Sequence, residues 1–229
     1  MRTYHLIGAC LVLLFLSSCR PSSIYLSPLP SQIERIEGYA SLRITGDQGS
    51  ARSKFSFLFQ LPNQGRIEVA NFLGTTLYQI IIDEGEAFLL VPSKKVYWHG
   101  EEDEIIGKFL GFRLNLHEMI SLLSGQWRGG KNQVRAKNWR GDWTLEKDEK
   151  GRIEYGRRGE LWFEIKEFFN STPFARLIIF EHPLNKGRLR ILNIGLNRPM
   201  KKQGFSKAFL ENYEQKTWLE IQEMLDNAN

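Results

Sequence analysis

The chain has 229 residues, of which 42% are hydrophobic, and a formal net charge of +5 from 31 basic and 26 acidic residues. This length is enough for one sizeable hydrophobic core. The charge is mildly basic, which suits a protein beside anionic lipid headgroups but does not by itself indicate a nucleic-acid-binding protein.

The first 18 residues have the pattern of a secretory signal peptide. Arg2 precedes an apolar run from Leu6 to Leu16, which is too short to span a membrane, since a spanning helix needs roughly 20 apolar residues. The run ends in Leu16-Ser17-Ser18-Cys19, a tetrad that resembles the lipobox of bacterial lipoproteins. We expect cleavage before Cys19 and acylation of its thiol. An ordinary signal peptide that happens to contain a cysteine is the alternative.

Cysteine usage agrees with acylation. Cys10 lies inside the predicted signal peptide, so the mature chain keeps one cysteine and has no internal disulfide. Removal of the first 18 residues from 229 leaves 211, and the loss of Arg2 lowers the net charge from +5 to +4. Residues 19–34 form a predicted tether. Its part from Arg20 to Gln32 contains three prolines and four serines, which predicts an extended segment of about 40 Å.

A hydrophobic period of two residues begins at Ile36 and predicts the strands of an antiparallel sheet. Alternating apolar and polar side chains occupy residues 36–44, 55–61 and 66–69, and denser apolar runs occupy residues 77–82 and 87–91. Glycine, proline and aspartate residues mark turns between these segments. We expect a meander whose strands have one side in water or facing a cavity.

The period then changes to that of a helix. Residues 101–110 and 116–123 each place apolar side chains at helical spacing, and Gly111 and Gly125 follow them. Strands resume around residues 139–146, 152–155, 160–168, 175–182 and 188–196, and a last helix is predicted from Ser206 to Leu225. The fold class is therefore mainly β (α+β), a strongly curved sheet or partial barrel with two helices inserted midway.

No motif for catalysis or metal binding stands out. The sequence lacks a nucleophile elbow, a phosphate-binding loop and a zinc-protease motif. His99, His117 and His182 have no cysteine nearby and no repeated carboxylate at metal-ligand spacing. We therefore expect no catalytic residue, no metal site and no cofactor, and a protein that is not an enzyme.

A basic stretch with tryptophans between its charges precedes the second group of strands. We interpret it as a solvated strand face, with contact to lipid phosphate or to the acidic rim of a carrier as the alternative; nucleic acid is not an expected partner. Its residues are Trp127, Arg128, Lys131, Arg135, Lys137, Trp139 and Arg140.

The first half of the chain, about residues 36–125, resembles LolB, the family of outer-membrane receptors that take lipoproteins from the periplasmic carrier LolA. The resemblance lies in the aromatic run Phe55-Ser56-Phe57-Leu58-Phe59, the loop Asn71-Phe72-Leu73-Gly74 before Thr75-Thr76-Leu77, and the helical segments Glu104-Ile105-Ile106-Gly107-Lys108-Phe109-Leu110-Gly111, Leu114-Asn115-Leu116 and Leu123-Ser124-Gly125. Asn115 stands where the family has proline, and Leu122 where it has tryptophan.

This resemblance implies an unclosed antiparallel β-barrel over residues 35–200, in which helices of about residues 101–125 form a lid over an apolar cavity, followed by a C-terminal helix within residues 201–229. Phe72 and Leu73 are expected to form a loop tip that enters the membrane; a hairpin whose apolar residues fold inward is the alternative. Either acyl chains or ordinary core packing are expected around Phe55, Phe57, Phe59, Leu77, Ile105, Ile106, Phe109 and Leu110.

The resemblance also implies a monomer that accepts acylated lipoproteins from a LolA-like periplasmic carrier and inserts them in the outer membrane. Membrane lipids are contacted through the acyl chains on Cys19. Arg20 follows this cysteine, whereas in enteric bacteria an aspartate there directs retention in the inner membrane, so the outer membrane is the expected location. Two alternatives stay open: a lipoprotein that binds another amphiphile, such as a lipid or lipopolysaccharide, and a structural envelope lipoprotein whose interior is filled with side chains.

Overall fold

The computed structural model describes residues 26, 28–46, 49–71, 73–127, 143–199 and 204–226. Strands dominate the first half, as the period of two predicts. They are β1 (Arg35–Gly46), β2 (Gly49–Gln60), β3 (Gln64–Ala70), β4 (Thr76–Asp83), β5 (Glu86–Val91) and β6 (Val96–Glu101), with a short 3₁₀ helix η1 (Pro92–Lys94) before the last. Strand β6 was not among the predicted elements.

Two nine-residue helices follow, α2 (Glu102–Leu110) and α3 (Leu116–Ser124), close to the predicted ranges. Gly111 and Gly125 end them in the left-handed conformation, with φ of 78° and 68°. The chain then returns to the sheet in β7 (Thr144–Lys147), β8 (Ile153–Arg158), β9 (Leu161–Phe168), β10 (Ala175–His182) and β11 (Asn185–Leu196).

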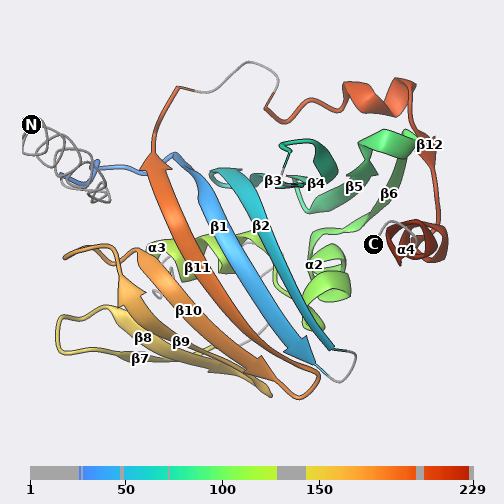
Figure 1. Cartoon of the computed structure of the whole chain (residues 1–229). Coiled ribbons are helices and arrows are strands. Elements are labelled where there is room, and N and C mark those ends of the chain that lie inside the picture. The colour runs from blue at the N-terminus through green and yellow to red at the C-terminus, as the bar shows by residue number, and fades with distance from the viewer. Residues whose placement is uncertain are drawn as a thin grey trace, which may run out of the picture.

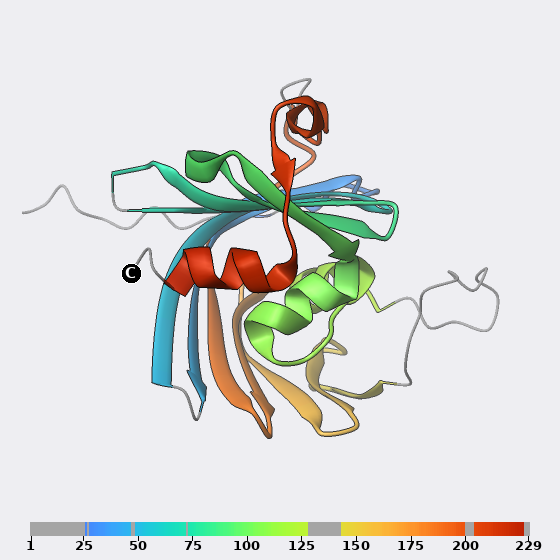
Figure 2. The same cartoon turned by 90° about the vertical axis from the view of Figure 1, so that its right-hand side faces the viewer.

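These strands belong to one sheet of twelve, in the order β12-β6-β5-β4-β3-β2-β1-β11-β10-β9-β8-β7, where β12 (Glu214–Gln215) is a short C-terminal strand. Strand β1 pairs with β2 on one side and with β11 on the other, which joins the two halves of the chain. The sheet is open, because β12 and β7 are its edges, and it curves around α2 and α3 (Figures 1 and 2). The predicted fold class is confirmed.

The predicted continuous helix from Ser206 to Leu225 is wrong. That region contains the 3₁₀ helix η2 (Ala208–Glu211), then β12, which runs parallel to β6, and then α4 (Trp218–Asp226). The helix starts late because Thr217 and Glu220 form its cap: the Thr217 N–H donates to Glu220 Oε2 at 2.8 Å, and the Glu220 N–H donates to Thr217 Oγ1 at 3.4 Å.

Two aromatic residues of the C-terminal region, Phe209 and Tyr213, pack on the sheet. Phe209 lies edge-on to Phe88 of β5 at 5.7 Å and to Tyr97 of β6 at 5.6 Å. With Tyr213 it covers a small outer core formed by Ile81, Phe88 and Leu90. Strands β4 and β5 are therefore buried on both faces, which explains their dense apolar runs. None of the described helices is long and apolar enough to cross a membrane.

We predict that α4 is an integral part of the folded domain. Ile221 is fully buried, so Ile221→Ala should lower the free energy of unfolding by about 2–4 kcal/mol. Leu219 on the same helix is 66% exposed, and Leu219→Ala should change it by less than about 0.5 kcal/mol. Urea unfolding measures both. If both variants change the free energy of unfolding by the same small amount, α4 does not unfold cooperatively with the rest of the domain.

Candidate functional site

An apolar cavity of about 260 Å³ lies between the concave face of the sheet and the helix pair α2–α3. A buried apolar cavity of about 150 Å³ already accommodates a benzene molecule, so this one has room for a segment of an acyl chain. Among the described residues, no charged side chain lines it, and its polar groups are those of Ser53, the Tyr78 hydroxyl and the Trp143 indole. Its chemistry is that of a site for hydrocarbon.

The sheet supplies the larger wall. Phe55, Phe57 and Phe59 alternate along β2, and their rings form a row with centroids 6.4 and 5.4 Å apart. All three line the cavity. The other strand residues of this wall are Leu42, Ile44, Ala51, Ser53, Ile67, Val69, Tyr78, Ile80, Leu161, Phe163, Ile178, Phe180, Leu189 and Ile191.

The helix pair supplies the opposite wall. Ile106, Phe109 and Leu110 of α2 line the cavity as expected, and Phe109 stacks on Tyr78 of β4 with centroids 5.5 Å apart. Burial raises the pKa of the Tyr78 phenol, and its hydrogen bond with Ser53 offsets part of that effect. The connecting segment and α3 add Phe112, Leu114, Met119, Leu122 and Leu123.

Two predicted cavity residues lie elsewhere. Leu77 is 45% exposed and is not among the lining residues, because successive strand residues face opposite sides and its neighbour Tyr78 is the one that points inward. Ile105 is fully buried but packs in the core of α2 and the sheet rather than along the cavity. The dense apolar run of β4 concealed which of its residues face inward.

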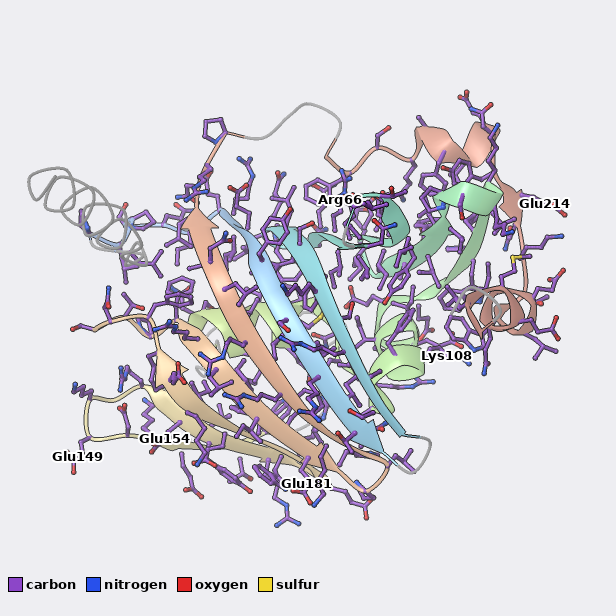
Figure 3. All side chains as sticks on the ribbon, viewed as in Figure 1. Arg66, Lys108, Glu149, Glu154, Glu181 and Glu214 are labelled. Atoms are coloured by element: carbon purple, nitrogen blue, oxygen red, sulfur yellow. The ribbon has the colours of Figure 1, made fainter. Side chains whose placement is uncertain are left out.

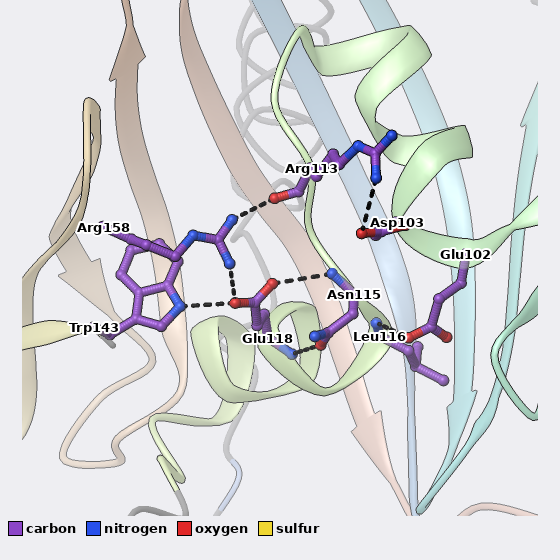
Figure 4. Close-up of polar contacts among 8 residues, drawn as sticks. All are labelled: Glu102, Asp103, Arg113, Asn115, Leu116, Glu118, Trp143 and Arg158. Atoms are coloured by element: carbon purple, nitrogen blue, oxygen red, sulfur yellow. Dashed lines mark hydrogen bonds and ion pairs between the residues drawn. The ribbon is translucent and has the colours of Figure 1, made fainter. Parts of the chain in front are cut away.

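A polar network holds α3 to the second half of the sheet (Figure 4). Asn115 caps α3 by accepting from the Glu118 N–H at 2.9 Å, and Glu118 Oε2 accepts from the Asn115 N–H at 3.0 Å. The buried Glu118 carboxylate also pairs with Arg158 of β8 and accepts from Trp143 Nε1 at 2.8 Å. Arg158 donates further to the carbonyl of Arg113, in the segment that joins the two helices.

Helix α2 has separate supports. Asn185 Nδ2, from the hairpin of β10 and β11, donates to the Leu110 carbonyl at 3.1 Å. Trp218 of α4 lies edge-on to Phe109 at 6.0 Å, with Lys108 Nζ 5.4 Å from its ring centroid. The C-terminal helix therefore contacts the same helix that forms a cavity wall.

A buried carboxyl links the starts of the two helices. Glu102 of α2 accepts from the Leu116 N–H of α3 at 3.4 Å. Burial raises the pKa of the Glu102 carboxyl, and the charges of Asp103 and Glu118 add to the increase. Burial of this carboxyl carries a cost at neutral pH, because the ionised form is out of water, and the hydrogen bond from Leu116 offsets part of that cost.

The loop between β3 and β4 exposes an apolar side chain. The Asn71 side chain accepts from the N–H groups of Leu73 and Thr75, both at 3.0 Å, and Gly74 takes a φ of 83°. Leu73 is 75% exposed, as expected for a loop tip. Phe72, Cys19 and the basic residues between 128 and 142 lie outside the described residues. Among the described residues, no group of three or more His, Cys, Asp or Glu could hold a metal ion.

Comparison with known proteins identifies the class of fold. A DUF1329 family protein from Desulfovibrio piger superposes with a TM-score of 0.56 at 9% identity, over 78% of this chain and 92% of that chain. A LolA superfamily protein from Nitrosomonas europaea superposes with a TM-score of 0.51 at 11% identity, over 77% of this chain and 91% of that chain. No known family matches the sequence, and no curated protein does. The chain thus has a LolA/LolB-like fold.

The sequence does not predict the whole polar network around Glu118. Its signal was present as Asn115-x-x-Glu118 before an apolar run, which is the pattern of a capping box. The contribution of Arg158 and Trp143 had no local signal, because they lie 40 and 25 residues away in the chain.

We predict that Glu118→Ala destabilises the fold by about 3–5 kcal/mol, because it leaves the Arg158 guanidinium without its buried partner. Glu118→Gln keeps the helix cap and should cost less. Urea unfolding gives the free energies, and hydrogen exchange of α3 amides should accelerate in the alanine variant. Equal costs for the two variants would contradict a role for the charge.

Glu102 predicts a pH dependence. Its folded pKa lies above the unfolded one, so its contribution favours folding in acid and is lost as pH rises from about 4.5 through the folded pKa. Glu102→Gln should therefore raise the free energy of unfolding at neutral pH by on the order of 1 kcal/mol, and the gain should vanish below the unfolded pKa. Urea unfolding across pH tests this, and a gain independent of pH would argue against titration of Glu102.

Proposed function

We propose that this protein is an outer-membrane lipoprotein that receives acylated lipoproteins from a LolA-like periplasmic carrier and inserts them in the outer membrane. The observation that carries the proposal is the apolar cavity between the sheet and the helix pair α2–α3. In this role it binds and transfers clients and catalyses no reaction. Its anchor would be the acylated Cys19 of the predicted lipobox.

Transfer energetics favour a protein of this kind. Each CH₂ group moved out of water is worth about 0.8 kcal/mol. A client with three acyl chains has on the order of 45 such groups, so exposing them to water would cost roughly 35 kcal/mol as an upper bound. Clients must therefore pass from one apolar cavity to another and then to a bilayer, and an apolar cavity on a membrane-anchored domain meets that need.

The cavity also sets a condition on the mechanism. At about 260 Å³ it accommodates part of an acyl chain and not three whole chains. Loading would require α2 and α3 to move away from the sheet. Such a movement would have to break the polar contacts that the second half of the sheet makes with them, through Arg158 and Asn185, and to expose buried residues such as Leu116.

The alternative of a structural lipoprotein with a filled interior is disfavoured by the cavity. A lipoprotein that binds another amphiphile on this scaffold would use the same apolar walls, so the test below includes it as an outcome. The fold similarity to a LolA superfamily protein supports the choice of acylated proteins as clients.

The test uses the full chain with Cys19→Ser, which removes the predicted acylation site. It should bind a fluorescent fatty acid and take an acylated lipoprotein from a LolA-like carrier. Native mass spectrometry of the purified protein identifies any bound amphiphile. Binding of lipid without transfer from the carrier would favour the alternative amphiphile, and failure of both would reject the proposal.

A matched pair of variants on β2 sharpens this prediction. Ser53→Phe fills the cavity and should weaken acyl binding at least about tenfold, since each excluded CH₂ costs about 0.8 kcal/mol. Ser56→Phe places the same ring on the opposite face of the same strand and should leave binding unchanged. Fluorescence titration measures both. Equal weakening by the two variants would place the probe outside the cavity.

A further inference from the structure

The convex face of the sheet carries three arginines in directly opposed positions. Arg43 of β1 pairs in register with Arg52 of β2 on one side and with Arg188 of β11 on the other. Their chain neighbours Leu42, Ser53 and Leu189 line the cavity, so the arginines point to the opposite, convex side, which faces the viewer in Figure 3. All three are exposed. We call them the arginine row.

No carboxylate among the described residues forms an ion pair with this row. Directly opposed residues of antiparallel strands have Cβ atoms about 5 Å apart, where like charges repel. None of the ion pairs among the described residues includes Arg43, Arg52 or Arg188. Glu167 is near Arg188, but its carboxylate is bound by Arg190 at 2.9 and 3.1 Å, and this bond chiefly lowers its pKa.

Two exposed side chains with apolar parts lie further along the sheet from the row, toward Lys54 and the start of β1. Phe55 of β2 pairs with Val69 of β3, so the neighbouring Lys54, which is also exposed, lies beside the end of β3 and the loop that exposes Leu73. Tyr39 is 55% exposed on the convex side of β1. Exposed basic side chains flanked by an aromatic and an aliphatic tip suit the headgroup region of a bilayer, where the charges meet phosphate and the tips meet the acyl boundary.

We propose that the arginine row docks this domain on the anionic phosphate headgroups of a phospholipid membrane. Arginine binds phosphate through two parallel N–H groups, and an exposed row of three can engage neighbouring headgroups. The predicted tether ends where β1 begins, and Arg43 lies about 26 Å further along that strand. This distance is shorter than the tether's length of about 40 Å, so an anchored chain can lay the row on the bilayer.

This proposal does not depend on what the cavity binds. It concerns the opposite face of the sheet, and its test needs no acyl ligand. Failure here would leave the proposed transfer function standing, and failure of transfer would leave membrane docking standing.

The experiment measures cosedimentation with vesicles, using the full chain with Cys19→Ser so that no acyl anchor contributes. Vesicles contain phosphatidylcholine alone or phosphatidylcholine and phosphatidylglycerol in equal amounts. We expect binding to the anionic vesicles that weakens with added salt. Each basic side chain near an anionic surface contributes roughly fivefold. The triple variant Arg43→Gln, Arg52→Gln, Arg188→Gln should therefore bind roughly a hundredfold more weakly.

Two further variants serve as controls. Lys94→Gln, Lys147→Gln, Lys150→Gln removes the same charge from exposed lysines outside the row and should keep binding within about twofold, because screening limits their reach. Arg43→Lys, Arg52→Lys, Arg188→Lys keeps the charge and should retain binding to the anionic vesicles. The glutamine variant should melt no earlier than the parent in circular dichroism, because the repulsion is gone.

Three results would overturn the proposal. One is no binding of the parent chain to anionic vesicles at low salt. Another is equal weakening by the lysine control, which would show that net charge alone is responsible. The third is a glutamine variant that loses binding to an acidic protein partner but binds anionic vesicles as well as the parent chain does.

Discussion

A sheet of twelve strands that bends into an open barrel must cover the apolar side chains on its concave face. Here α2 and α3 lie over that face, and each has nine residues. Such a helix is about 14 Å long, whereas the 12-residue strands β1, β2 and β11 extend about 40 Å. The mismatch in length leaves apolar wall uncovered, and the cavity is its consequence.

Polar side chains add to the apolar packing that holds the helix pair. Besides buried residues such as Ile105 and Leu116, the pair is positioned by the Glu118 carboxylate, by Asn185 at the end of α2, and by the contact between Trp218 and Phe109. Polar contacts exchange readily for water once they open, whereas packed apolar surfaces do not. Movement of the pair away from the sheet would break these polar contacts and expose the buried apolar residues of both helices.

Much of the fold could be predicted from the sequence, because the strands around the cavity have one face in the core and so alternate cleanly. Phe55, Phe57 and Phe59 could be assigned to one face of β2 for that reason. The assignment failed in β4, because its dense apolar run does not alternate, and the exposed Leu77 could not be distinguished from its inward neighbours. The predicted C-terminal helix failed for a different reason. The four-residue spacing of Phe209 and Tyr213 fits a helix, and only the Thr217 cap and the pairing of β12 with β6 decide otherwise.

Strands β2, β1 and β11 give the sheet two different chemistries. Their inward residues line the cavity with hydrocarbon, and their outward residues carry the arginine row, because side chains alternate between the faces. A bilayer held against the convex side would therefore lie on the side of the sheet opposite the cavity. The repulsion within the row is tolerable because the long pairing of β1 with both neighbours holds the strands in register. Pairing and core packing thus stabilise the fold enough to keep unpaired charges on its surface, where an anionic membrane would relieve their repulsion.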